Sequence, residues 1–376
     1  MKITLPTPHM SDEGYEKEYI KEAFDTNWIA PLGKNVTEFE NEMVKFLGAK
    51  EAVALSSGTA SIHLGLKMLG VKQGDIVFCQ SFTFSGSCNP IAYCGAKPVY
   101  IDSEITSGNM SPIALKKAYE KYPNPKAVII VDLYGTPANY DELLPIIKEH
   151  NTPILEDAAE ALGGKYKGVY LGLYGDCGVL SFNGNKIITT SGGGMLLVNN
   201  KEQKDKVVYW STQSREKCLW YEHKEIGYNY RLSNVLAGIG RGQLKVLQKR
   251  VDKKREIYAT YKKRFEGCKY ITMFGEQKDS EPNRWLSVIS LKNTKVKAME
   301  LIDYLFKNEV ETRPAWKPMH MQPVFKDCDF FSEKQVGSTC QDIFESSICL
   351  PSDTKTDLKD IEFVAKLIID YLEKNS

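Results

Sequence analysis

Short apolar runs alternate with longer stretches of helical periodicity along the first half of the chain. The short runs are rich in β-branched residues, as buried strands are, and the longer stretches place apolar residues on one face of a helix. Regular alternation of this kind predicts an α/β fold with a large, mixed or mostly parallel central sheet. The expected strands lie within residues 52–55, 76–80, 98–102, 127–135, 153–159 and 177–183, and the expected helices between them include residues 110–122 and 139–150.

Amphipathic patterns before and after this region predict further helices. The first would be capped by Ser11, and the second would end at Gly48, because glycine tolerates the left-handed backbone that follows many helices. Composition changes near Gly267, where polar loops and short strands begin. We therefore expect a large domain over residues 1–249 and a small C-terminal α+β domain over residues 250–376. The further helices are expected at residues 11–26, 37–48, 252–265 and 298–310, and residues 227–251 should join a polar aromatic turn to a long helix.

Composition narrows the class of protein. The 376 residues include 49 lysines and arginines against 48 aspartates and glutamates, so the formal net charge is +1. This balance gives no indication of a basic surface that would bind a nucleic acid or a membrane. The sequence has no run of about 18 apolar residues and no apolar secretory core at its start. The nine cysteines are scattered without a CxxC pair, which argues against a disulfide framework and against a metal site. These features predict a soluble, cytoplasmic protein.

The most distinctive stretch is residues 177–197, where one lysine, Lys186, lies between an apolar strand and the glycine run Gly192-Gly193-Gly194. Partial burial of a lysine favours its neutral amine, which can attack a carbonyl group. An ordinary hairpin with an exposed lysine at its tip explains the local pattern equally well.

A second candidate site is the small-residue turn Ser57-Gly58-Thr59, at the predicted start of a helix. Free backbone amides and the positive end of the helix dipole make such a turn an anion site. A plain serine cap of a helix is the alternative. In parallel sheets, ligands bind beyond the carboxyl ends of the strands, and Phe84, Asp157 and Ser181 are expected there.

Together these residues meet the four requirements of pyridoxal 5'-phosphate (PLP). Lys186 would hold its aldehyde covalently, and Asp157 would keep its ring nitrogen protonated. Ser57, Gly58 and Thr59 with Ser181 would bind its phosphate, and Phe84 would lie against its ring. We predict a PLP enzyme.

The same motifs resemble the DegT/DnrJ/StrS family of PLP-dependent nucleotide-sugar aminotransferases, over essentially the whole chain. They are residues 57–59, 81–84, 156–159, 181–186 and 227–231. The resemblance implies PLP fold type I (aspartate aminotransferase-like) and a homodimer with shared active sites. It also implies that Asn229 reaches the cofactor phosphate of the neighbouring subunit, with a simple turn asparagine as the alternative. Glu160 stands where many relatives carry glutamine or histidine, at a position that faces the cofactor's phenolic oxygen.

Within that family, residues 183–196, 227–234 and 311–320 are most similar to the 4-aminotransferases of N-acetylbacillosamine biosynthesis. This similarity implies L-glutamate as amino donor and UDP-4-keto-6-deoxy-N-acetylglucosamine as acceptor. Another keto-sugar (dTDP-linked, or with a 3-keto group) and a non-catalytic PLP-binding regulator remain alternatives. A sugar dehydratase fits less well because such enzymes replace the lysine by histidine, and a nicotinamide enzyme lacks its GxGxxG motif here.

For the acceptor sugar we expect contacts from two loops and one arginine. Arginine suits a diphosphate because its planar fork donates two parallel hydrogen bonds, and tryptophan offers a flat apolar face. A surface ion pair is the alternative role for Arg313, and a packed loop histidine is the alternative for His320. The candidates are Asn27, Trp28, Ile29, Ala30, Pro31, Leu32, Arg231, Arg313, Trp316 and His320.

Overall fold

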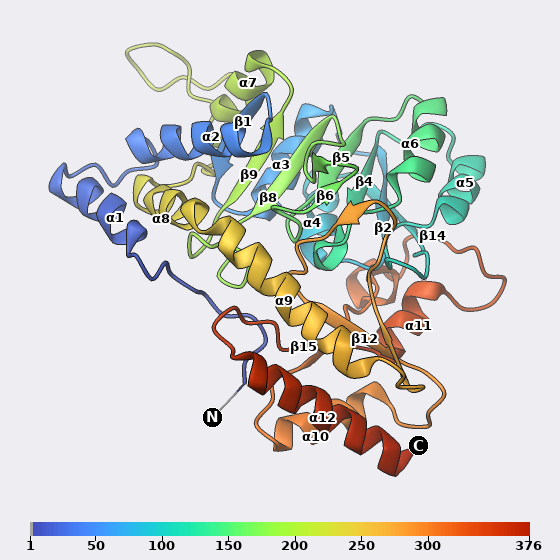
Figure 1. The fold of residues 1–376 in the computed structure, drawn as a ribbon. Coiled ribbons are helices and arrows are strands. Elements are labelled where there is room, and N and C mark those ends of the chain that lie inside the picture. The colour runs from blue at the N-terminus through green and yellow to red at the C-terminus, as the bar shows by residue number, and fades with distance from the viewer. Residues whose placement is uncertain (1–2) are drawn as a thin grey trace.

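An eight-stranded mixed sheet forms the centre of the protein in a computed structural model that describes residues 3–376 (Figure 1). The strand order is β1-β9-β8-β5-β4-β2-β3-β14. Strand β9 runs antiparallel to β1 and β8, and all other neighbours are parallel. The predicted α/β fold with a mixed, mostly parallel sheet is therefore confirmed. The strands are β1 (Glu51–Leu55), β2 (Ile76–Gln80), β3 (Lys97–Ile101), β4 (Ala127–Val131), β5 (Ile154–Asp157), β8 (Cys177–Ser181), β9 (Gly194–Val198) and β14 (Phe330–Phe331).

Helix α3 (Gly58–Met68) brings the predicted anion site to this sheet. It packs across β9, β8 and β5, with α4 and α7 beside it. Gly65 permits the close approach, because a Cβ atom there would lie 2.8 Å from Leu155 Cδ1. The other helices of this region are α1 (Tyr15–Asp25), α2 (Lys34–Leu47), α4 (Ser85–Tyr93), α5 (Pro112–Lys121), α6 (Tyr140–Glu149), α7 (Lys201–Ser211) and α8 (Asn234–Lys245).

The predicted helix boundaries are confirmed in one place and wrong in two. Helix α2 ends before Gly48, whose φ of 72° is left-handed, as expected. Helix α1 begins after Gly14 rather than at Ser11, because Gly14 has a left-handed φ of 78° that a right-handed helix cannot include. The Ser11 hydroxyl still accepts a hydrogen bond from the Tyr15 amide. The expected long helix within residues 227–251 stops at Lys245, and a separate helix, α9 (Leu247–Phe265), follows Val246.

A smaller four-stranded antiparallel sheet follows in the chain, in the order β10-β12-β15-β13. It shares a second apolar core with α9, α10 and α12, which are drawn in gold, orange and red and lie together in Figure 1. Ile3 also joins this core, whereas β14 joins the large sheet. The elements of this part of the chain are β10 (Ile271–Met273), β12 (Ser287–Leu291), α10 (Ala298–Lys307), β13 (Arg313–Pro314), β15 (Ser347–Leu350) and α12 (Leu358–Asn375), together with α11 (Thr339–Ser346), whose buried residues join the first core.

The predicted boundary between the large and the small domain, at residues 249 and 250, falls inside α9. The division into these two domains stays a prediction. A small third sheet, in the order β11-β6-β7, connects the two regions through β6 (Lys165–Tyr166), β7 (Val169–Tyr170) and β11 (Ser280–Glu281). Over residues 3–376, no helix is long and apolar enough to cross a membrane. The same residues contain no cluster of three or more histidine, cysteine or acidic side chains that could hold a metal ion.

Candidate active site

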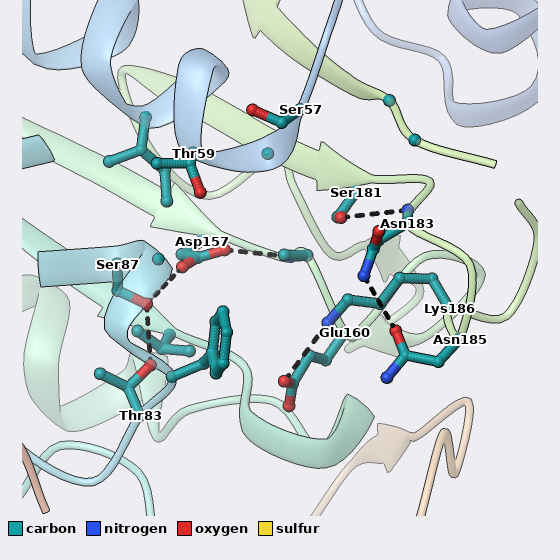
Figure 2. A pocket seen from close by; sticks show the side chains of 18 of the residues that line it. Ser57, Thr59, Thr83, Ser87, Asp157, Glu160, Ser181, Asn183, Asn185 and Lys186 are labelled. Carbon is teal, nitrogen blue, oxygen red and sulfur yellow. Dashed lines mark hydrogen bonds and ion pairs between the residues drawn. The ribbon is translucent and has the colours of Figure 1, made fainter. Parts of the chain in front are cut away.

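A cavity of about 350 Å³ lies where β5 and β8 end, facing the N-terminus of α3. Figure 2 shows the side chains around it: Ser57 and Thr59 on α3, Asp157 beside Ser87, and Lys186 extended toward Glu160. The lining residues are Ser56, Ser57, Gly58, Thr59, Ile62, Thr83, Phe84, Gly86, Ser87, Val131, Asp157, Ala159, Glu160, Ser181, Asn183, Asn185, Lys186, Gly192, Gly193, Trp285 and Trp316.

Asp157 is the last residue of β5, and its carboxylate is buried. Ser87 Oγ donates to its Oδ2 at 2.7 Å, and the amide of Ala159 donates to its Oδ1 at 3.1 Å. Thr83 Oγ1 lies 2.8 Å from Ser87 Oγ and orients it. Burial raises the pKa of Asp157, and the two hydrogen bonds and the charge of Lys186 oppose that rise. The carboxylate is thus fixed in direction by donors that favour its charged form.

Lys186 is not the exposed tip of a hairpin, because only 12% of its side chain is accessible. A turn closed by its amide and the Asn183 carbonyl at 3.0 Å directs the side chain into the cavity. Its Nζ lies 3.4 Å from Glu160 Oε1 and 4.2 Å from the centroid of the Trp285 ring. The amine therefore lies between a carboxylate and an aromatic face.

Glu160 is buried, and the amide of Tyr134 donates to its Oε2 at 2.8 Å. Burial raises the pKa of Glu160, and the charge of Lys186 and the Tyr134 amide oppose that rise. Tyr134 has a φ of 55°, which is uncommon for a residue with a side chain. That backbone conformation aims its amide at Glu160, as strained residues at functional sites often do.

The N-terminus of α3 meets the glycine run behind the cavity. Ser57 caps the helix through its side chain, which accepts from the Ala60 amide at 3.0 Å. The amides of Gly58 and Thr59 have no acceptor within the helix, because they belong to its first turn. A Cβ atom on Gly194 would lie 2.3 Å from the Ser57 carbonyl carbon, so only glycine permits this approach. The turn can therefore receive an anion.

These residues fit PLP. One lysine, one fixed carboxylate and one helix N-terminus open into a single cavity, with the half-exposed ring of Phe84 at its wall. Lys186, Asp157, Glu160, Ser57, Gly58, Thr59, Phe84 and Ser181, all predicted to touch the cofactor, line the cavity together. Their individual roles stay predictions.

Of the residues predicted to contact the sugar, Trp316 lines the cavity and the others do not. Arg231 is instead directed away from it, since its Nη1 pairs with buried Glu40 and donates to the Ala54 carbonyl at 2.9 Å. Arg231 therefore does not face this cavity within the single chain, and its contact with the sugar stays a prediction. His320 Nδ1 lies 2.7 Å from Ser81 Oγ, which matches the packed loop histidine that the sequence left open.

The remaining predicted contacts lie at the surface of the single chain. Arg313 Nη2 pairs with Glu311 Oε1 at 2.9 Å, the surface ion pair that was its alternative. Asn229 is exposed, so its side chain is available to a second subunit. The loop Asn27, Trp28, Ile29, Ala30, Pro31 and Leu32 is exposed throughout, and its Trp28 and Ala30 carbonyls accept hydrogen bonds from Asn234.

Several lining residues were not predicted. Ser87 was missed, and Thr83 was included in the motif 81–84 but given no role, although Ser87 Oγ contacts both Thr83 Oγ1 and Asp157 Oδ2. Asn183 and Asn185 belong to the turn that the sequence had already marked. Nothing in the sequence linked Trp285 to the site, because it lies far along the chain at the start of an apparently ordinary strand.

Comparison with known proteins agrees with this geometry. The sequence model of the "DegT/DnrJ/EryC1/StrS aminotransferase family" matches residues 11–369. EpsN of Bacillus subtilis (strain 168), whose name describes a pyridoxal phosphate-dependent aminotransferase, is 48% identical over 93% of this chain and 91% of its own. The GDP-perosamine synthase of Escherichia coli O157:H7 is 34% identical over 98% of both chains.

A Campylobacter jejuni protein (serotype O:23/36, strain 81-176) named UDP-4-amino-4,6-dideoxy-N-acetyl-beta-L-altrosamine transaminase is 31% identical over 91% of both chains. Among solved structures, the PLP-form of Spr1654 from Streptococcus pneumoniae, named as a sugar aminotransferase, has a TM-score of 0.90. It covers 100% of this chain and 99% of its own at 22% identity, which supports the fold. The chain belongs to the DegT/DnrJ/EryC1/StrS aminotransferase family and is a PLP-dependent sugar aminotransferase of fold type I.

Proposed function

We propose that this enzyme moves an amino group from L-glutamate to the 4-keto carbon of UDP-4-keto-6-deoxy-N-acetylglucosamine, and that Lys186 and Asp157 are its catalytic residues. The observation that carries the catalytic assignment is that a largely buried lysine and a hydrogen-bonded carboxylate open into one cavity with a helix N-terminus. When bound, PLP supplies a carbonyl that takes up the amino group and a ring that accepts electrons.

The protein's own part is to bind, orient and move a proton. The amides of Gly58 and Thr59, with Ser57 and Ser181 beside them, are suited to the phosphate. Asp157 would hold the ring nitrogen of PLP through its fixed negative charge, which favours the protonated nitrogen. The amine of Lys186 would remove the α-proton of glutamate as a general base and return a proton as a general acid.

Glu160 would orient the Lys186 amine between these two proton transfers. Its Oε1 lies 3.4 Å from Nζ, and its Oε2 is held by the Tyr134 amide, so one oxygen is fixed and the other faces the lysine. Burial raises the pKa of Glu160, which favours its protonated form beside an anionic oxygen of the cofactor. This arrangement is compatible with a carboxyl group beside the expected place of the cofactor's phenolic oxygen.

Trp316 is the best supported contact for the sugar. Its ring lies beside Phe84, with ring centroids 6.0 Å apart, and its backbone amide donates to Tyr134 Oη at 2.9 Å. The indole Nε1 is buried and has no hydrogen-bond partner among residues 3–376. A buried donor at a cavity wall is costly unless a ligand accepts from it. A sugar hydroxyl or acetamide oxygen would satisfy this group.

The relatives' names mention both UDP and GDP sugars, so the nucleotide needs a direct test. We expect the highest kcat/KM for UDP-4-keto-6-deoxy-N-acetylglucosamine, measured by mass spectrometry with glutamate as donor. Loss of the acetamido group should lower kcat/KM by orders of magnitude if protein groups hydrogen-bond it, whereas the extra methyl of thymine should cost about ten- to two-hundredfold. A preference for a dTDP or GDP sugar would overturn the substrate assignment and leave the aminotransferase unaffected.

A homodimer with shared active sites predicts complementation between subunits. We expect mixed dimers of Lys186→Ala and Asn229→Ala protein to be more active than either parent, because one of their two sites would contain both native residues. The exposed position of Asn229 makes it available to a partner. The measurement is glutamate-dependent turnover after the two proteins are mixed and refolded together. Activity equal to the sum of the parents would contradict a shared site.

A further inference from the structure

Trp285 contacts the Lys186 amine from a segment far along the chain. Its ring is 1% exposed, and the ring centroid lies 4.2 Å from Lys186 Nζ. Its indole Nε1 donates to the Asn185 carbonyl at 2.8 Å. One side chain therefore contacts both the amine and the backbone immediately before the lysine.

The backbone amide and the backbone carbonyl of Trp285 both form hydrogen bonds. Its amide donates to Asn283 Oδ1 at 2.9 Å, and its carbonyl accepts from buried Lys254 Nζ at 2.8 Å. Asn283 Nδ2 also donates to the Glu160 carbonyl at 2.9 Å. The same short segment thus contacts both members of the Lys186–Glu160 pair, and it leads directly into β12 of the smaller sheet.

The chemistry of this contact differs from that of a hydrogen bond. An aromatic face attracts a cation through its quadrupole but accepts no proton in the usual sense. The N–H groups of an ammonium over the ring therefore remain available to Glu160 and to a bound substrate. The charged groups that face Lys186 are Glu160 and, through its Coulomb interaction, Asp157.

We propose that Trp285 is a positioning residue for Lys186, which stabilises the charged form of its nitrogen and fixes the turn that carries it. The inference rests on the proposed role of Lys186. It assigns a function to a residue in the segment before β12, outside the motifs that identify the cofactor site.

The test compares Trp285→Leu and Trp285→Phe with the control Trp210→Leu, all as PLP-loaded full-length protein. Trp210 is a matched control because it is buried, has Lys67 Nζ 5.0 Å from its ring, donates from Nε1 to Glu225, and does not line the cavity. The first readout is the pH midpoint of the visible absorbance band of bound PLP. Loss of the ring in Trp285→Leu should lower that midpoint by about 0.4 to 1.5 pH units, since the charged form loses its aromatic partner.

Trp285→Phe keeps an aromatic face but loses the hydrogen bond to Asn185. Its pH midpoint should therefore lie closer to that of the wild type than to that of Trp285→Leu. In Trp285→Leu, we expect kcat to fall by roughly ten- to a hundredfold through misplacement of the amine, with little change in the KM for glutamate. An unchanged midpoint in folded, PLP-loaded Trp285→Leu, or an equal shift in Trp210→Leu, would overturn the inference.

Fluorotryptophan provides a second test if Trp285→Leu does not fold. The fluorinated ring keeps the shape of the indole, but its face is less negative. Incorporation of fluorotryptophan should therefore lower the pH midpoint of the PLP absorbance band in the protein with wild-type sequence. In Trp285→Phe, where four of the five tryptophans remain, it should have no such effect. An equal effect in both proteins would contradict the inference. PLP found on a lysine other than Lys186 after borohydride reduction would instead refute the underlying site assignment.

Discussion

Replacement of Lys186 by alanine is expected to abolish transamination while PLP still binds noncovalently. The α-proton of glutamate would lose its base and the carbonyl of PLP its covalent partner, whereas Asp157 and the N-terminus of α3 would remain. General acid–base catalysis alone contributes about 10²- to 10⁴-fold, and loss of the covalent link adds to that. The measurements are glutamate-dependent turnover and PLP retained after dialysis.

The control is Lys167→Ala, which removes an exposed lysine paired with Asp141 and should leave turnover near wild type. Turnover within tenfold of wild type in Lys186→Ala would place the proton transfer on another residue. Loss of PLP binding together with loss of activity would leave the catalytic role unresolved, so both quantities are measured on the same preparation.

Replacement of Asp157 by asparagine should raise the barrier to α-proton removal by at least about 3 kcal/mol, roughly a hundredfold or more in rate. The asparagine side chain has nearly the same shape as the aspartate side chain but carries no charge, so it cannot keep the ring nitrogen of PLP protonated. Stopped-flow absorbance with glutamate alone measures this half-reaction.

Ser87→Ala is the matched comparison for Asp157→Asn. It removes one donor to Asp157 and leaves the charge in place, so it should slow the half-reaction less than Asp157→Asn does. An unchanged rate in Asp157→Asn, or a larger effect in Ser87→Ala, would show that the charge of Asp157 is not what matters.

Local patterns predicted the parts of the site that come from strand ends. Asp157 and Ser181 end their strands, and Lys186 lies on the turn after one, so a parallel sheet brings them to one edge without further information. The turn at Ser57 was a weaker signal, because serine caps before helices are common, and it pointed to an anion site only together with Lys186 and Asp157. The positions of Asp157, Ser181 and Lys186 needed only the order of elements along the chain.

Contacts across long distances in sequence could not be predicted in this way. Trp285 reaches Lys186 through the fold of the smaller sheet, and Tyr134 reaches Glu160 through a left-handed backbone that no residue preference favours. The ion pair of Arg231 with Glu40 on α2 was also not predicted, because nothing in the sequence pairs these two residues. Helix α1 begins later than expected because Gly14 adopts a left-handed backbone with a φ of 78°.

The central claim is that Lys186 holds PLP in this cavity, and the most direct test is reduction of the PLP-loaded enzyme with borohydride followed by peptide mass mapping. We predict that the added mass of reduced PLP is found on the peptide that contains Lys186. Treatment with glutamate before reduction should remove that mass, because the amino group is then transferred to the cofactor. PLP attached to a different lysine, or attachment to Lys186 that glutamate does not reverse, would contradict the account.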